Sequence, residues 1–207
     1  MFIEKLKIKF DVNEPIFIED ILLLFKEFTK AYVFRLIKQS VENGNLIKFS
    51  RGVYFIPKKT FYGTSTITSS IVANRKYISS GDNIYGIYAG LSLLNMFSIS
   101  TQIPNTLEII TNNETTRKRV VDIDGIKFVI RKSRFEITKE NYSYYVILQL
   151  FLDLGTNPNL DDFAKQRIKQ YMKETNIDQN RLLKLGVNFP TQAMKNLLRS
   201  EVLNGTI

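Results

Sequence analysis

The sequence predicts an α+β protein, with an N-terminal winged helix-turn-helix followed by a mixed α/β domain that ends in helices. Three observations lead to this prediction. Two helical segments joined by a short turn precede a pair of short alternating strands, which is the element order of a winged helix-turn-helix. Basic residues gather in and after the second helical segment. Strand and hairpin signals then give way to helical periodicity toward the C-terminus.

The N-terminal domain is predicted to span residues 1–60. Residues 18–26 (IEDILLLFK) predict a short helix, and Thr29 is a suitable N-cap for a second helix that ends near Asn43, before Gly44. At helical spacing this second helix has an apolar face and a polar face. The apolar face consists of Val33, Leu36, Ile37, Ser40 and Val41, and the opposite face of Ala31, Tyr32, Arg35, Lys38, Gln39 and Glu42.

Residues 46–57 (LIKFSRGVYFIP) predict a hairpin of two alternating strands around the turn Ser50-Arg51-Gly52. We expect Ile47, Phe49, Val53 and Phe55 to point to one side of it. Gly52 is expected at a turn position that requires positive φ.

The charge of this domain predicts duplex DNA as its partner. Residues 30–59 contain seven basic residues and one acid, a net charge of +6 within a total of +9. A helix fits the major groove, where arginine pairs with guanine, glutamine with adenine and lysine with phosphate. The hairpin tip would reach the flanking minor groove or phosphates. The predicted DNA-binding residues are Lys30, Ala31, Tyr32, Arg35, Lys38, Gln39, Lys48, Ser50 and Arg51.

The second domain is predicted to span residues 61–207, after a polar linker at residues 58–68. We expect a helix over residues 85–97, a strand over residues 106–111, and a hairpin over residues 119–131 around the turn Asp124-Gly125. Thr138 and Asn141 are expected to cap a helix that reaches Leu154. Further helices are predicted over residues 161–174, 178–185 and 190–203.

A second basic cluster is predicted on the hairpin of this domain. It consists of Arg117, Lys118, Arg119, Arg131, Lys132 and Arg134. Because these residues have no obvious acidic partner nearby in the sequence, they are available for a phosphate-bearing ligand or an acidic surface. The alternative is that they solvate a hairpin edge and discourage strand pairing.

Composition argues against an enzyme. The chain has no cysteine and no histidine, which removes thiolate nucleophiles, imidazole bases and the usual zinc ligands. No glycine-rich loop opens a helix, so no cofactor is expected. Asp122 and Asp124 are interpreted as a cross-strand partner of Lys127 and a turn residue, and no metal site is expected. Without an apolar run long enough for a membrane span, and without a signal peptide, we expect a cytoplasmic protein.

Residues 85–112 (YGIYAGLSLLNMFSISTQIPNTLEIITN) resemble the signature of the AbiEi abortive-infection antitoxin family. The matching residues are Gly86, Gly90, Leu94, Asn95, Thr101, Gln102, Ile103, Pro104, Thr111 and Asn112. Residues 51–54 resemble the Arg-Gly-Val-Tyr that ends the family's winged helix-turn-helix, and residues 119–133 resemble its basic hairpin. The resemblance covers residues 17–154.

The resemblance implies an antitoxin of a type IV toxin-antitoxin system. Such proteins bind inverted repeats in their own promoter to repress the operon. Their C-terminal domain counteracts a nucleotidyltransferase toxin without requiring a stable complex with it. Two alternatives remain open: a one-component transcriptional regulator whose second domain senses a ligand, and a nucleic-acid enzyme that uses Asp122, Asp124 or Glu108 as metal ligands.

Overall fold

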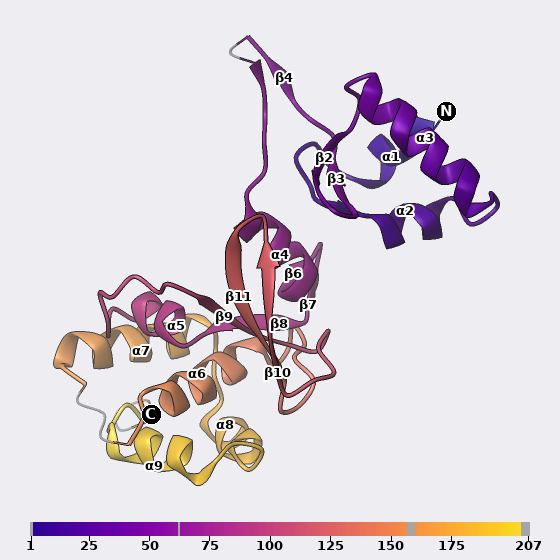
Figure 1. Ribbon diagram of the computed structural model, residues 1–207. Coiled ribbons are helices and arrows are strands. Elements are labelled where there is room, and N and C mark those ends of the chain that lie inside the picture. The colour runs from indigo at the N-terminus through magenta and orange to yellow at the C-terminus, as the bar shows by residue number, and fades with distance from the viewer. Residues whose placement is uncertain (1, 62, 157–159, 204–207) are drawn as a thin grey trace. The chain divides into compact units, whose positions relative to one another are not determined.

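The computed structural model describes residues 2–61, 63–156 and 160–203 (Figure 1). The chain divides into two compact units. The first comprises the residues up to Arg75 together with Ile123–Gly125, and the second comprises Lys76–Asp122 and the residues from Ile126 onward. Both units contain helices and small sheets, so the predicted α+β class is confirmed. The predicted division at residue 60, as a boundary between separately folding domains, stays a prediction.

In the first unit, the described residues up to Phe55 form three helices and a three-stranded sheet. The helices are α1 (Phe2–Lys9), α2 (Ile18–Leu24) and α3 (Lys30–Glu42). The strands are β1 (Ile16–Phe17), β2 (Ile47–Ser50) and β3 (Val53–Phe55), with β3 in the middle and antiparallel to both neighbours. The predicted helices at residues 18–26 and from residue 30 to Glu42, and the predicted hairpin, are therefore present. Gly52 has a φ of 75°, as expected for its turn.

Helix α1 is an element that the sequence did not predict. Its residues alternate lysine with apolar side chains, a pattern that does not predict a helix. Leu6 is the one residue of α1 that is fully buried. The ring of Phe2 lies 4.6 Å from that of Phe25 in α2. The helix thereby completes a core of the first unit that also includes Ile16, Ile21, Val33, Ile37 and Leu46.

Residues 58–61 and 63–65 form a hydrogen-bonded ribbon, so the linker predicted at residues 58–68 is not an irregular loop over this part. Strands β4 (Lys59–Thr60) and β5 (Gly63–Thr64) pair antiparallel. Threonine is a good strand former, and Gly63, with φ of 120°, permits the sharp return of the chain. A hairpin therefore forms where the polar composition suggested a loop. Helix α4 (Ser69–Tyr77) follows.

The second unit is built on a four-stranded sheet in the order β10–β11–β9–β8. Its strands are β8 (Gly86–Ala89), β9 (Leu107–Thr111), β10 (Lys118–Ile123) and β11 (Ile126–Lys132). β8 runs antiparallel to β9, and β9 runs parallel to β11. The predicted turn joins β10 and β11, since Asp124 and Gly125 both have positive φ, 52° and 80°. A short ribbon of β6 (Ser79–Ser80) and β7 (Asn83–Ile84) precedes the sheet.

The helix predicted over residues 85–97 is wrong in its first half. Residues 86–89 form strand β8, and only α5 (Leu91–Met96) is helical. A Cβ atom on Gly86 would lie 1.9 Å from the carbonyl oxygen of Tyr77 and 2.9 Å from that of Ile110. The small residues that suggested close helix packing thus permit close backbone approach in a sheet. Gly90, with φ of 61°, then separates the strand from the helix.

Four helices complete the second unit: α6 (Tyr142–Asp153), α7 (Asp162–Glu174), α8 (Gln179–Gly186) and α9 (Thr191–Arg199). The predicted helices at residues 161–174 and 178–185 are confirmed, with their N-caps Asp161 and Asp178. The last helix ends at Arg199, earlier than predicted. Helix α6 is buried along most of its length and lies between β8 and the pair α8 and α9 (Figure 1).

Candidate nucleic-acid interface

Helix α3 places the predicted DNA-binding side chains on its exposed face. Val33, Ile37 and Ser40 are buried in the first unit. Lys30, Ala31, Arg35, Lys38 and Gln39 are exposed, and Tyr32 is partly exposed. The Thr29 hydroxyl oxygen accepts a hydrogen bond from the Tyr32 backbone N–H at 3.3 Å, which confirms the predicted N-cap. Phe34, with 49 % of its surface accessible, shares the exposed face and is not among the predicted DNA-binding residues.

Two contacts hold cations on the exposed face of α3. The Arg35 guanidinium lies over the Tyr32 ring, 4.9 Å from its centroid, so the ring limits the freedom of that side chain. The Lys38 ammonium lies 3.9 Å from a carboxylate oxygen of Glu42, and both side chains are largely exposed. Because an exposed ion pair of this kind contributes at most about 1 kcal/mol, Lys38 can exchange Glu42 for a phosphate.

The hairpin β2–β3 carries the other predicted DNA-binding residues. Lys48 and Arg51 are exposed, and Ser50 is partly exposed. Lys48 pairs with Tyr54 and Ser50 with Val53, with a β-bulge between these two pairs. The bulge interrupts the alternation that was predicted to place Phe49 beside Ile47 on one face. At the turn, the carbonyl oxygen of Gly52 accepts a hydrogen bond from Ile18 at 2.8 Å, which ties the hairpin to α2.

A small apolar pocket of about 130 Å³ lies next to the start of α3. Its lining residues are Phe2, Lys5, Phe25, Phe28, Tyr32 and Leu36. The rings of Phe28 and Tyr32 are 5.1 Å apart. Tyr32 therefore contacts aromatic neighbours on one side and Arg35 on the other, which makes it a support for the exposed face of α3.

The second basic cluster is only partly available, because three of its six side chains have partners in the second unit. Arg119 forms an ion pair with the buried Glu114. The Arg131 Nη1 atom lies 3.3 Å from Glu108 Oε2, and the Arg134 guanidinium lies over the Phe189 ring at 5.4 Å. The prediction that the cluster is available is thus wrong for Arg119 and Arg131, whose partners Glu114 and Glu108 both precede the cluster in the sequence. Arg117, Lys118 and Lys132 are exposed and form no ion pair with any residue in the described ranges.

Glu114 is a buried carboxylate of the second unit that accepts several hydrogen bonds. One oxygen accepts hydrogen bonds from the backbone N–H groups of Thr115 and Thr116 and from the Thr116 hydroxyl, at 2.9, 3.0 and 2.9 Å. The other accepts from Arg119. Although burial raises the pKa of Glu114, these hydrogen bonds outweigh it and lower the pKa to about 2. Arg119 is therefore a structural residue.

Several residues of the predicted family motif hold loops together. The Asp153 carboxylate accepts hydrogen bonds from the Gly90 backbone N–H and the Gln149 side chain, each at 2.7 Å, and burial raises the pKa of Asp153. Asn95 donates to the carbonyl oxygen of Gln102 at 2.8 Å. Gln102 and Thr101 are exposed and Pro104 is partly exposed, so this stretch lies at the surface.

Asn112 connects three segments of the second unit. Its side-chain oxygen accepts hydrogen bonds from the Ser133 hydroxyl and the Ile137 N–H, both at 2.9 Å, and its side-chain nitrogen donates to the Ile137 carbonyl at 2.8 Å. It also lines a groove of about 560 Å³ together with Asp82, Lys139 and neighbouring residues. Because both the oxygen and the nitrogen of its side chain are hydrogen-bonded, Asn112 has a structural role beside that groove.

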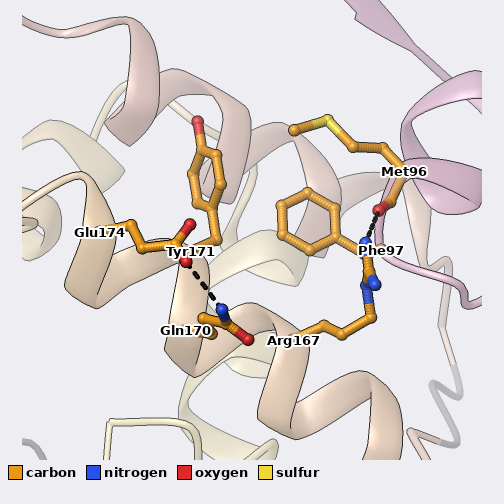
Figure 2. A pocket seen from close by; sticks show the side chains of 6 residues that line it. All are labelled: Met96, Phe97, Arg167, Gln170, Tyr171 and Glu174. Atoms are coloured by element: carbon orange, nitrogen blue, oxygen red, sulfur yellow. Dashed lines mark hydrogen bonds between the residues drawn. The ribbon is translucent and has the colours of Figure 1, made fainter.

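A smaller pocket of about 240 Å³ lies between α5 and α7 (Figure 2). Arg167 donates to the Met96 carbonyl oxygen at 3.1 Å, and Gln170 donates to Glu174 at 2.7 Å. Tyr171 packs edge-on against the Phe97 ring at 5.3 Å. Burial raises the pKa of Tyr171. The contacts of Arg167 with Met96 and of Tyr171 with Phe97 join α7 to the end of α5. They give the residues that line the pocket a structural role.

Glu108 and Asp124, two of the three possible metal ligands, have other roles in the structure. Glu108 pairs with Arg131, and Asp124 occupies the β10–β11 turn. Across residues 2–61, 63–156 and 160–203, no group of three acidic side chains is arranged to hold a metal ion. Over the same residues, every helix is too short or too polar to cross a bilayer.

These features define a two-unit α+β protein whose first unit exposes a basic helix beside a basic hairpin. Residues 5–180 match the family described as "Family of unknown function (DUF6088)", and the chain belongs to this family. No curated protein and no solved structure matches the chain.

Proposed function

We propose that the first unit is a winged helix-turn-helix module that binds duplex DNA, with α3 in the major groove and the β2–β3 hairpin on the flanking backbone. The observation that carries the proposal is the exposed face of α3, where Arg35, Lys38 and Gln39 lie opposite the buried Val33 and Ile37. Arginine and glutamine at such positions donate to guanine and adenine edges. Lys48 and Arg51 extend the positive surface to the hairpin.

The charge of the surrounding sequence supports the same proposal. Between Glu42 and Asp82 the chain contains no acidic residue. A partner surface that follows the hairpin and the segment after it therefore meets no acidic residue of that stretch, and Glu42, which pairs with Lys38, is the one acid of α3. Binding through phosphates releases counterions, so the affinity should fall steeply with salt.

Binding of the full chain to a duplex from its own upstream region tests the proposal. Arg35→Ala should cost about 1–3 kcal/mol and relax the preference at one base position. Lys48→Ala should weaken all sequences alike and reduce the salt slope by about 1. Lys195→Ala, an exposed lysine of α9, is the matched control and should change neither. If Arg35→Ala and Lys48→Ala both bind like the parent protein, α3 and the hairpin are not the interface.

The biological role that we propose is that of an antitoxin which represses its own operon through inverted repeats and counteracts a nucleotidyltransferase toxin. The resemblance of residues 85–112 and 51–54 to AbiEi-type antitoxins supports this role. Within the second basic cluster, Arg117, Lys118 and Lys132 form no ion pair with a described residue and are available for opposing the toxin or binding its phosphate-bearing substrate. Growth rescue on co-expression with a co-encoded nucleotidyltransferase tests the role, and absence of rescue contradicts it.

One observation favours the alternative of a ligand-sensing transcriptional regulator. The groove beside Asn112 has a volume of about 560 Å³, within the usual range for small-molecule sites. An isolated gene without a neighbouring nucleotidyltransferase frame would favour this alternative, and such a frame would favour the antitoxin.

A further inference from the structure

The β4–β5 ribbon is a feature of the first unit to which the proposed interface assigns no role. Lys59 pairs with Thr64 and Thr60 with Gly63, so the chain reverses at the position of Phe61. The Phe61 side chain is 98 % exposed. Figure 1 shows the ribbon extending outward from the three-stranded sheet of the first unit.

Hydrogen bonds fix the base of this ribbon. The Lys58 backbone N–H donates to the Ser65 hydroxyl at 2.8 Å, and the Ser65 N–H donates to the Lys58 carbonyl at 3.0 Å. The Ser65 hydroxyl in turn donates to the side chain of Asn13, whose backbone N–H donates to Ile56 at 2.9 Å. The base of the ribbon is thus attached to the unit that carries α3.

The chemistry of the ribbon fits a nucleic-acid groove. Lys58 and Lys59 are both exposed, in a segment free of acidic residues from position 43 to position 81. A single exposed phenylalanine is ordinary on a protein surface. A phenylalanine at the end of a basic two-stranded ribbon is different, since a ribbon fits into DNA grooves and apolar wedges of this kind insert between base steps.

We propose that the β4–β5 ribbon is a second DNA contact, in which Lys58 and Lys59 bind phosphates along the minor groove and Phe61 wedges between base pairs and bends the duplex. The inference rests on the proposed DNA-binding function of the first unit. It adds a third element to α3 and the β2–β3 hairpin, and it gives the protein an activity, DNA bending, that groove reading by α3 alone does not require.

The test uses the full-length protein and an end-labelled duplex from its own upstream region, with affinity measured at several salt concentrations and bending by energy transfer between the ends. The parent protein should bend the duplex by about 20–90°. Phe61→Ala should weaken binding about ten-fold and lose the bend, while the salt slope is unchanged. Phe61→Tyr keeps a flat ring and should retain both.

Two further variants separate the roles of ring and charge. Lys58→Ala with Lys59→Ala should reduce the slope of log affinity against log salt by about 2, because two phosphate contacts are lost. Phe163→Ala removes another exposed phenylalanine, in α7 of the second unit, and should leave affinity, slope and bend at the parent values.

The outcomes distinguish this inference from the function on which it rests. If the parent protein binds the duplex but Phe61→Ala matches it in affinity and bend, the inference is overturned and the proposed function stands. Loss of growth rescue by Phe61→Ala with unchanged DNA binding would also overturn it and assign the ribbon to a protein partner. If the parent protein binds no duplex, the proposed function and the inference both fail.

Discussion

At the residue scale, the positions of acidic side chains decide which cations are available for a partner. Glu114 is 4 % exposed and is surrounded by the N–H groups of Thr115 and Thr116, the Thr116 hydroxyl and Arg119. A buried carboxylate without such donors would be costly. Glu114 therefore removes Arg119 from the basic surface and makes it part of the structure of the second unit.

We expect Glu114→Gln to lower the free energy of unfolding at neutral pH by about 1–3 kcal/mol, because it weakens charge-assisted hydrogen bonds to a buried group. The folded-state pKa of about 2 lies below the ordinary value of 4.5, so the carboxylate contributes stability above pH 4.5. That contribution is lost as the pH falls toward 2. Denaturant unfolding across this pH range measures the difference between the two proteins.

A stability difference between parent and Glu114→Gln that stays constant from pH 7 down to the acid range would contradict this account. Glu136→Gln is a suitable control, since Glu136 is exposed, and it should leave the stability of the protein nearly unchanged.

At the element scale, capping residues decide where the C-terminal helices begin. Asp178 accepts a hydrogen bond from the Arg181 backbone N–H at 2.7 Å and so caps α8, a helix of eight residues. The Asp178 backbone N–H also donates to the Tyr144 hydroxyl at 3.1 Å, which ties the start of α8 to α6. The cap therefore positions a helix that packs on the central buried helix.

Asp178→Ala should destabilise the protein by about 1 kcal/mol, because the cap is lost and a helix N–H is left without its acceptor. Asp178→Asn should cost much less, since asparagine caps equally well and the backbone bond to Tyr144 is unaffected. Thermal unfolding of the two variants gives the comparison. Equal destabilisation by alanine and asparagine would mean that charge, and not the cap, carries the effect.

At the scale of the whole molecule, the two units have separate apolar clusters. The cluster around Leu6, Phe25, Val33 and Ile37 lies in the first unit, and the cluster around α6 lies in the second. A region with its own core can fold without the rest of the chain. The division of labour proposed for DNA binding and antitoxin activity requires such independence.

A fragment that begins at Lys76 should unfold cooperatively, fail to bind the upstream duplex, and still rescue cells from the cognate toxin. Circular dichroism, DNA-binding and growth assays measure the three properties. The full-length protein is the control for rescue. A fragment that folds and yet rescues nothing would show that the first unit contributes to antitoxin activity, and the division of labour would fail.

Local sequence patterns were sufficient to predict α3, the β10–β11 turn and the starts of α7 and α8. Thr29, the apolar spacing of Val33 and Ile37, and Gly44 define α3 and its exposed basic face without long-range information. Asp124-Gly125 likewise defines the β10–β11 turn, since both residues tolerate positive φ. Asp161 and Asp178 mark helix starts for the same local reason, a side chain that accepts from the first turn.

Only the tertiary structure decided the features that depend on contacts distant in sequence. Gly86 is in a strand because the Tyr77 and Ile110 backbones approach it closely, which no local pattern reports. Arg131 is paired because parallel β9 brings Glu108 next to it from 23 residues away. The ribbon at residues 58–65 is held by Asn13, 52 positions before Ser65. Helix spacing, caps and tight turns are set by neighbouring residues, whereas the availability of a charge or the choice between strand and helix at small residues is set by what packs against them.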